Sequence, residues 1–412
     1  MNFEPSARAQ EYLGRVAAFI DAEVLPVEHA VLGEYAALDP KDWRGWRESA
    51  EVARLRDAAR AQGLWNLFLP DTEHGAGLST LDYAPVAEAM GRVPFAPELF
   101  NCNAPDTGNM EVLHYFGTPQ QKQRWLEPLL DASIRSVFCM TEPGVASSDA
   151  TNIAGDISFE GDDVVINGRK WWITGIGHPR CAFAFFLGRS DPQAARHQQH
   201  SLVLVPMDTP GVRIERMLSV LGEFDAPYGH GEIVFEGVRV PVENVILGRG
   251  RGFEIAQGRL GPGRIHHCMR CIGAAERALS LMLERGLVRE AFGKPLLDLG
   301  GNRERIADLR VAIDQARLLT LHAAWQIDRV GARDVSAQRA IAAIKLVVPN
   351  MLQRVVDEAI QMFGAAGLAH DLPLAAFFVQ ARALRIADGP DAVHRQTLAK
   401  LEIAAHQARA KQ

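Results

Sequence analysis

The sequence predicts an α+β fold built from successive parts, because its hydrophobic periodicity changes twice along the chain. Before about residue 134, apolar residues recur every third or fourth position, as on one face of a helix. Residues 135–247 are instead rich in β-branched and aromatic residues in short alternating runs, and helical spacing returns at about residue 249. We therefore expect an N-terminal helical domain (1–134), a middle antiparallel β-barrel domain (135–248) and a C-terminal four-helix bundle (249–412).

Composition and charge narrow the class of protein. The 412 residues are 48% hydrophobic and 23% charged, and the net charge of −6 without a basic block argues against nucleic acid as a partner. No run of 18 apolar residues occurs, so we expect no membrane span. The five scattered cysteines predict a reducing compartment without a disulfide framework. The N-terminal segment carries Glu4, Glu11 and Asp21 in an amphipathic helical pattern unlike a targeting peptide, and we expect a cytoplasmic protein.

The N-terminal helices are predicted from their apolar faces and their end signals. A Gly- and Pro-rich stretch after Pro70 indicates a loop. Ser79 is placed to cap the helix that follows this loop. Thr118, with Pro119 behind it, is placed to cap another. Helices are expected at residues 7–29, 43–62, 81–90, 107–116 and from 119 onward.

The middle part is predicted to form short antiparallel strands joined by tight turns. Gly161 lies in a turn between two strand-like runs, and Asn167-Gly168 predicts a further hairpin, because a type I′ turn needs positive φ at both central residues. The polar stretch 189–200, with His197 and His200, predicts a surface loop. Strands are expected at residues 157–159, 164–166, 170–174, 181–188, 201–207 and 231–240.

The C-terminal part contains long helical patterns and one sharp break. Successive helices are expected around residues 265–283, 306–316 and 341–360, the third kinked at Pro349. Gly389-Pro390 must interrupt a fourth, so Asp388 lies on a short turn between the helical segments 374–386 and 391–407. Position alone favours a helix cap for Asp388 over a carboxylate placed for chemistry. Asp391 is also placed to cap the last helix.

Clusters at residues 138–149, 170–175 and 289–295 could carry chemistry. The first mixes hydroxyls, small residues and Pro, so it could line a polar ligand, although a domain linker has the same composition. The second holds Trp171-Trp172, which could form a wall for a flat aromatic ligand or belong to a barrel core with one indole inside. The third places two cations around Phe292, either to meet a pyrophosphate or to end a helix favourably.

Several common motifs are absent from the sequence. No GxGxxG opens a βαβ unit, and Gly293-Lys294 is followed by Pro rather than by the Ser or Thr of a phosphate-binding loop. Cys268 and Cys271 form a single CxxC without a partner pair. His266-His267 are adjacent, so they face different directions on a helix, and a core or substrate-contact role is favoured over metal binding. We expect no metal site.

Taken in this order, the segments resemble the acyl-CoA dehydrogenase family over nearly the whole chain. The matching segments are residues 69–92, 138–149 (TEPxxGSD, with one extra residue), 170–174 (KxWIT), 289–294 (RxxFGK) and 361–367 (QxFGGxG). Where the family usually has Tyr-Glu-Gly-Thr, this chain has Ala387-Asp388-Gly389-Pro390. That ending, with Ser147-Ser148-Asp149 and Trp171-Trp172, looks like the subgroup around the mammalian family members ten and eleven and their bacterial relatives.

The resemblance implies the family's fold and an FAD-dependent reaction of fatty acid β-oxidation. Asp388 would remove the pro-R α-proton of an acyl-CoA while the β-hydride passes to the flavin, giving a trans-2-enoyl-CoA. The α-proton of a thioester is weakly acidic, so the carbonyl must be polarised and the base desolvated. The backbone N–H of Asp388 would help to hold that carbonyl. Asp is one methylene shorter than Glu, so the turn or the substrate must lie closer.

The family's contacts can be transferred by position. Electron-transfer flavoprotein would accept the electrons, and some FAD contacts would come from a neighbouring subunit of a dimer or tetramer. Pro390 replaces a hydroxyl donor of the family. The cofactor contacts would be Phe138, Met140, Thr141, Ser147, Ser148, Trp172, Ile173, Thr174, Arg289, Phe292, Gln361, Ala365, Pro390 and Ala392; the substrate contacts would be Ser148, Arg264, Asp388 and Gly389.

Other readings of the same resemblance remain open. A flavin oxidase of the superfamily, such as nitroalkane oxidase, also uses an Asp base. A family member that binds flavin or CoA as an assembly protein is a non-catalytic alternative. The subgroup resemblance raises 4-hydroxyacyl-CoA, 4-phosphoacyl-CoA and long or branched acyl chains as substrates, and no residue decides chain length.

Overall fold

Two structural units make up the chain, one of packed helices and one built on a β-sheet. The computed structural model describes residues 2–410. The helical unit comprises the residues up to Gly33, Arg54–Phe100 and the chain from Gly261 onward. The β unit comprises Glu34–Ala53 and Asn101–Leu260. Each unit therefore joins segments that are far apart in the sequence.

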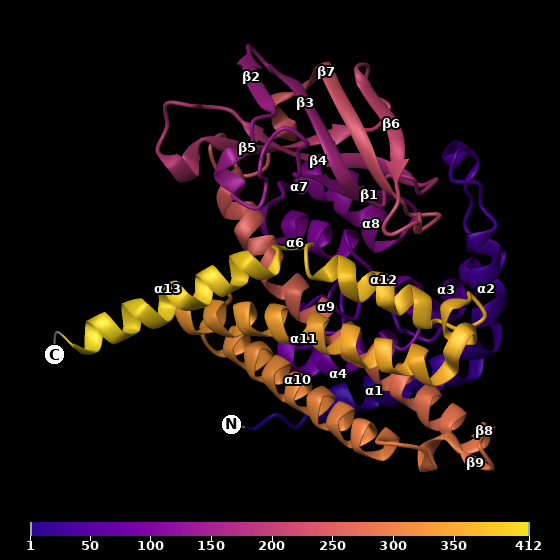
Figure 1. Cartoon of the computed structure of the whole chain (residues 1–412). Coiled ribbons are helices and arrows are strands. Elements are labelled where there is room, and N and C mark those ends of the chain that lie inside the picture. The colour runs from indigo at the N-terminus through magenta and orange to yellow at the C-terminus, as the bar shows by residue number, and fades with distance from the viewer. Residues whose placement is uncertain (1, 411–412) are drawn as a thin grey trace. The chain divides into compact units, whose positions relative to one another are not determined.

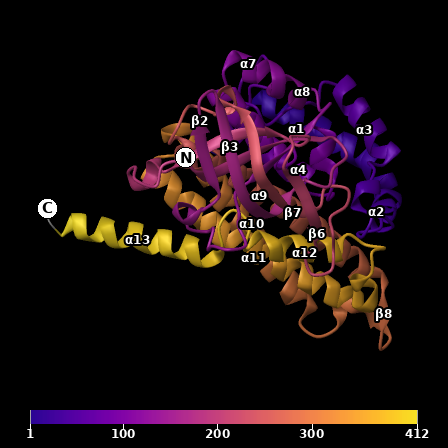
Figure 2. The ribbon, with the colours of Figure 1, turned by 90° about the horizontal axis from the view of Figure 1, so that it is seen from above.

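The helical unit is formed by short N-terminal helices and long C-terminal ones (Figure 1). The N-terminal helices are α1 (Ala7–Phe19), α2 (Glu28–Ala36), α3 (Ala50–Ala61), α4 (Thr80–Met90) and α5 (Ala96–Leu99). The long helices are α9 (Gly252–Val288), α10 (Asn302–Val330) and α11 (Val335–Phe363), followed by α12 (Leu374–Leu384) and α13 (Asp391–Arg409). Both views show α10, α11 and α12 side by side (Figures 1 and 2). These are the helices of the predicted bundle.

Helix ends confirm the predicted caps. Ser79 Oγ accepts a hydrogen bond from the N–H of Asp82 at 3.1 Å at the start of α4. In the β unit, Thr118 and Gln121 form a reciprocal capping box at the start of α7 (Pro119–Gln121). Helix α11 continues through Pro349 without interruption, and a kink within it stays a prediction.

Close packing of α4 against α9 fixes the helix that carries several site residues. A Cβ added to Gly273 would lie 1.9 Å from the carbonyl oxygen of Glu88, and one added to Gly91 would lie 2.1 Å from that of Arg270. Only glycine permits this approach. Arg317 adds an ion pair with Glu88 at 2.8 Å. This close contact fixes the rotation of α9 about its own axis, and so fixes which of its side chains point away from α4.

The β unit holds a seven-stranded sheet in the order β1-β4-β2-β3-β7-β6, with β5 also paired to β4. The strands are β1 (Arg135–Cys139), β2 (Asp156–Glu160), β3 (Asp163–Thr174), β4 (Cys181–Arg189), β5 (His200–Pro206), β6 (Val212–Leu218) and β7 (His230–Pro241). Helices α6 (Asp106–Phe116), α7 and α8 (Glu127–Leu130) precede them. β1 runs parallel to β4, so the sheet is mixed rather than purely antiparallel.

Two local predictions in this sheet are wrong, and one strand was not predicted. Asn167-Gly168 lies inside β3 at a shift in the register with β7, so it marks a bulge and not a hairpin. The side chain of Asn167 stabilises this irregularity by accepting from the N–H of Gly237 at 2.7 Å. His200 begins β5 and is buried, with Nε2 2.9 Å from the carbonyl oxygen of Ile153, so it does not lie on a surface loop. Strand β6 was not predicted, although its alternation of apolar and charged residues is typical of a half-buried strand.

Two further expectations can be compared with the structure. None of the helices described between residues 2 and 410 is long and apolar enough to cross a bilayer. The five cysteines are all free thiols, as expected from their scattered positions.

Candidate active site

The turn between α12 and α13 carries Asp388, and a buried lysine fixes the backbone that leads into it. Lys345 of α11 donates from Nζ to the carbonyl oxygens of Leu384 at 2.7 Å and Ala387 at 2.9 Å. Carbonyls at a helix C-terminus lack intrahelical partners, and a cation there also meets the negative end of the helix dipole. The end of α12 is therefore held to α11 immediately before Asp388.

The backbone of this turn is left-handed at consecutive residues. The φ angle is 54° at Asp388 and 104° at Gly389. Asp tolerates this region better than most residues because its short side chain can form local hydrogen bonds. A Cβ added to Gly389 would also lie 2.9 Å from His394 Nε2. Strained conformations of this kind persist where the surroundings enforce them, commonly at functional sites.

Three side chains of the helical unit surround Asp388. Nε2 of His267, on α9, lies 3.3 Å from Oδ2 of Asp388. Arg264, one turn earlier on α9, donates from Nε to the backbone carbonyl of Asp388 at 3.2 Å. Nε2 of His394, on α13, meets the same carbonyl oxygen at 3.3 Å. The carboxylate thus faces an imidazole, while the backbone carbonyl of Asp388 is tied to α9 and α13.

His394 contributes as a neutral donor. Burial, assisted by the charges of Arg264 and Lys345, lowers the pKa of His394 to about 4. A carbonyl oxygen only accepts, so the proton of the neutral ring must lie on Nε2. His394 therefore holds the turn without adding a positive charge near neutral pH.

Neither aspartate of the turn caps α13. The helix begins after Pro390 without a side-chain cap. Asp391 accepts instead from Nε and Nη2 of Arg385, at 3.0 and 2.9 Å. The capping hypotheses for Asp388 and Asp391 are therefore wrong. The Asp391 carboxylate still lies in the first helical turn, where the dipole favours a negative charge.

In the β unit, a buried ion pair fixes the segment 138–149. Nζ of Lys170 lies 2.7 Å from Oε1 of Glu142 and also donates to the carbonyl oxygens of Met140 and Leu187. Burial alone would raise the pKa of Glu142, but the ammonium of Lys170 and two backbone N–H groups hold it below its usual value. The segment is thus a loop anchored to β3, which a plain linker would not be.

The adjoining end of β3 presents an aromatic side chain to the surface. Trp172 has a φ of 55° and is 41% exposed, at a register shift between Lys170 and Ile173. The neighbouring Trp171 donates its backbone N–H to the carbonyl of Thr141 at 3.0 Å and is also outside the core. The alternative of a barrel core with one indole inside is therefore wrong. A bulge turns the indole of Trp172 outward, where it can meet a flat ligand.

Other predicted residues of the β unit lie around this strand end. Thr174 Oγ1 is 3.0 Å from Nδ1 of His230, whose ring lies 6.1 Å from that of Trp172. Ile173 is buried in the sheet's core, so any ligand contact from it would come from its backbone. Ser147 Oγ accepts from the N–H of Glu142 at 2.9 Å, whereas Ser148 is exposed.

A hairpin after α9 carries Phe292 and directly follows Arg289, two residues that the family resemblance assigns to the cofactor. β8 (Glu290–Ala291) and β9 (Lys294–Pro295) enclose a turn with positive φ at both Phe292 and Gly293, as in a type I′ hairpin. Phe292 is 95% exposed. The guanidinium of Arg285 stacks 5.5 Å from the ring of Phe363, so the end of α9 lies beside the end of α11.

The predicted site residues therefore fall into three groups. The β unit contains Phe138, Met140, Thr141, Ser147, Ser148, Trp172, Ile173 and Thr174. The turn, the start of α13 and the facing part of α9 contain Arg264, Asp388, Gly389, Pro390 and Ala392. The far end of the helical unit contains Arg289, Phe292, Gln361 and Ala365, all exposed.

Several residues beside these groups were not predicted as site residues. His230 and Lys345 reach the groups only through sheet register and helix packing, which no local pattern reveals. Arg259 lies over the ring of Phe138, 4.3 Å from its centroid, and had no motif to mark it. His267 did have a signal, since it is one of two adjacent histidines on a predicted helix.

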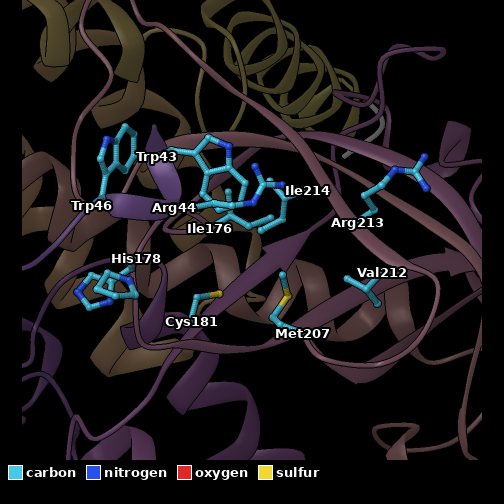
Figure 3. A pocket seen from close by; sticks show the side chains of 12 residues that line it. Trp43, Arg44, Trp46, Ile176, His178, Cys181, Met207, Val212, Arg213 and Ile214 are labelled. Atoms are coloured by element: carbon cyan, nitrogen blue, oxygen red, sulfur yellow. The ribbon is translucent and has the colours of Figure 1, made fainter. Parts of the chain in front are cut away.

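A hollow of about 380 Å³ in the β unit lies apart from these groups (Figure 3). Trp43, Trp46 and His178 line it on one side and Met207 on another, and the guanidinium of Arg213 points away from it. None of the predicted site residues lines it. The hollow is therefore a separate feature from the candidate active site.

Comparison with known proteins places this chain in a family. Models of the N-terminal, middle and C-terminal domains of acyl-CoA dehydrogenases match residues 7–133, 137–238 and 250–402. The "Probable acyl-CoA dehydrogenase FadE2" of Mycobacterium tuberculosis is 50% identical over 404 residues, which cover 98% of this chain and 97% of that protein. The chain belongs to the acyl-CoA dehydrogenase family. The resemblance inferred from the sequence and the fold expected from it are both confirmed.

Other relatives refine this picture. Acyl-CoA dehydrogenase family member 10 of Mus musculus is 55% identical over 390 residues, covering 93% of this chain but 36% of that protein. The chain thus spans about half or less of the length of the curated animal relatives it matches. A solved structure of a proposed acyl-CoA dehydrogenase from Mycobacterium abscessus has a TM-score of 0.95 and 59% identity, covering 98% of this chain and 100% of that one.

Proposed function

We propose that this acyl-CoA dehydrogenase family member uses FAD to oxidise an acyl-CoA to its trans-2-enoyl-CoA, with Asp388 as the base. The observation that carries this proposal is the turn itself. A carboxylate is held on a left-handed residue, 3.3 Å from an imidazole, by a backbone tied to three helices. A carboxylate placed at such structural cost is suited to proton transfer.

The residues of the turn would carry out the proton transfer. The carboxylate of Asp388 takes the α-proton, and the N–H of Asp388 would hydrogen-bond the thioester carbonyl and stabilise the charge that develops there. Arg264 supplies a positive charge beside the base, which favours its ionised form. The side chain of Asp388 is 25% exposed, and this partial burial strengthens each of these interactions, because the effective dielectric constant is lower there than in water.

The residues at the end of β3 fit an isoalloxazine ring. Trp172 offers an exposed indole face, and the hydroxyls of Thr141, Ser148 and Thr174 lie on the same strand end and its anchored loop. A flat ring with polar edges is bound well by one aromatic wall and a few such donors. When bound, FAD supplies the acceptor for the β-hydride.

We further propose that the enzyme is a homo-oligomer that passes electrons to electron-transfer flavoprotein. Leu287, Val288 and Phe292 support the first part, because these apolar side chains, close together in the chain, are 63%, 77% and 95% exposed. Grouped exposed apolar side chains are typical of a surface covered by a partner. If FAD is shared between subunits, Arg289→Ala should weaken FAD retention and the oligomer together. Sedimentation and bound-flavin absorbance would measure both, and loss of neither would refute the shared contact.

Anaerobic mixing of the purified flavoprotein with a panel of acyl-CoAs tests the reaction. The panel should include straight, branched, 4-hydroxy and 4-phospho acyl chains. We expect bleaching of the flavin band with at least one member, slowed about 10³-fold by Asp388→Asn, a change within the usual range for a general base. Asp371→Asn, an exposed carboxylate on the loop before α12, is the matched control and should leave the rate unchanged.

Other outcomes separate the alternatives. A colourless protein that cannot be reconstituted with FAD would refute the proposal and favour an assembly role. Rapid hydrogen peroxide formation in air, with turnover of a nitroalkane, would favour the oxidase. Bleaching that persists at the normal rate in Asp388→Asn would show that another residue is the base.

A further inference from the structure

One face of α9 lines up charged and polar side chains toward Asp388. Arg264, His267 and Arg270 are spaced by three residues, so they lie on neighbouring turns of the same helix face. His266 lies on another face, buried 4.8 Å from the ring of Tyr83 in an edge-to-face contact. The two adjacent histidines therefore have separate roles, and only His267 reaches the turn.

Both ring nitrogens of His267 lie close to a polar partner. Its Nε2 lies 3.3 Å from Oδ2 of Asp388, and its Nδ1 lies 3.1 Å from Nη2 of Arg270. Arg270 is buried, with 7% of its surface exposed, and belongs to the closely packed contact between α9 and α4. The row Arg270–His267–Asp388 thus runs from a fixed point of the helical unit to the carboxylate.

The chemistry of the guanidinium settles the positions of the protons. Arginine has five N–H donors and no acceptor, so Nδ1 of His267 must accept. The ring proton then lies on Nε2, from where it donates to the carboxylate of Asp388. A doubly protonated ring would turn an N–H toward the guanidinium and place two cations side by side. Arg270 therefore selects the neutral tautomer that donates to Asp388.

We propose that Arg270 and His267 form a hydrogen-bonded relay that orients the carboxylate of Asp388 and maintains it in its ionised form. This inference rests on the proposed function, in which Asp388 is the base. His267 is then a positioning residue, because it acts on the reaction through Asp388. The relay compensates for the short side chain of Asp, which has less reach than Glu and depends more on a fixed direction.

Other charged and titratable groups around the turn act on its backbone. Arg264 and His394 bind the carbonyl oxygen of Asp388, and Lys345 binds that of Ala387. Cys268, also on α9, stays a thiol because burial raises its pKa. Nε2 of His267 lies 3.3 Å from a carboxylate oxygen of Asp388, so removal of His267 should change the chemistry of the base more than the position of the turn.

The test is the pH dependence of anaerobic flavin reduction in three variants at position 267. A donor to the charged form of a carboxylate lowers its pKa, so losing that donor in His267→Leu should move the acid limb of the rate profile upward. We expect a shift of about one pH unit, a tenfold change in proton affinity, with a maximal rate about tenfold lower. His267→Gln places an amide N–H at the Nε2 position and should restore both. His267→Asn, whose shorter amide cannot reach Asp388, should resemble the Leu variant.

A second measurement does not depend on turnover. In histidine-labelled protein, ¹⁵N chemical shifts assigned with the Gln variant should show His267 neutral at pH 7 with its proton on Nε2, and Arg270→Met should disturb that tautomer. A proton on Nδ1, or a doubly protonated ring, would overturn the relay whether or not the protein reduces its flavin. Normal rates and a normal acid limb in His267→Leu would also overturn it, with the proposed function intact. A wild-type protein inert toward every acyl-CoA would instead refute the proposed function.

Discussion

The turn at Asp388 and the end of β3 at Trp172 use the same unusual backbone for different purposes. Both residues are left-handed, with φ angles of 54° and 55°. At Asp388 the conformation is held by polar contacts from α9, α11 and α13. At Trp172 it results from a bulge in a sheet whose neighbouring positions are anchored by the Glu142–Lys170 pair. The first region places a charge, and the second places an apolar surface.

This difference predicts which substitutions in each region should reduce stability and which should reduce activity. The turn depends on several separate hydrogen bonds, so single substitutions there should change chemistry more than stability. The strand end depends on the buried Glu142–Lys170 ion pair. A substitution in this pair should therefore cost more stability than one at the exposed Trp172. The predictions below separate these two behaviours, beginning with the largest expected loss of stability.

Lys170→Met should destabilise the fold more than the substitutions at His394 and Trp172 that follow. It leaves the carboxylate of Glu142 buried without its cation and removes the donor to two backbone carbonyls. Breaking one partner of a buried pair costs about 3–5 kcal/mol, and we expect about 3 because two backbone N–H groups still bind Glu142. Denaturant unfolding measures this loss. Adding Glu142→Gln should recover part of it, and a cost below about 1 kcal/mol would show that the pair does not anchor the loop.

His394 should make the turn sensitive to acid. Its pKa is about 4 when folded and about 6.5 when unfolded, so between these values the unfolded chain binds more protons. Stability contributed by the neutral ring is therefore complete above pH 6.5 and is lost as the pH falls toward 4, by up to about 3 kcal/mol. His394→Gln keeps a donor to the Asp388 carbonyl and removes the titration. Thermal unfolding should show the variant gaining on the wild type below pH 6, and parallel curves would contradict this assignment.

The sequence predicted much of the fold because its signals there are local. The caps at Ser79 and Thr118 and the break at Gly389-Pro390 depend on residues within one turn of each other. Asn167-Gly168 carries an equally strong local signal, yet pairing with β7 overrides it and makes a bulge. Local preference decides structure only where no tertiary partner competes.

The candidate site was predictable only in part, for a related reason. Asp388 and Trp172 lie within recognisable motifs, so the resemblance to the family identified them. The residues that hold Asp388 and Trp172 in place do not lie within such motifs. Lys345 is 43 residues from Asp388, the separation of their numbers, and His230 meets Thr174 through the pairing of β3 with β7. Such residues come into position only when the chain folds, so one sequence gives no sign of their partners.

Two single substitutions by Asn, Trp172→Asn and Asp388→Asn, give the most direct comparison of the two regions. Asn tolerates this conformation better than Trp, so Trp172→Asn should relieve about 1 kcal/mol of strain and offset the modest contacts of an indole that is 41% exposed. We expect unfolding of the FAD-free protein to change by less than about 1 kcal/mol and FAD retention to weaken about tenfold, roughly the energy of one aromatic contact. Asp388→Asn should instead retain FAD normally and lose flavin reduction. If Trp172→Asn held FAD as tightly as the wild type, the exposed indole would not be the wall of the cofactor site, and its strained backbone would need another explanation.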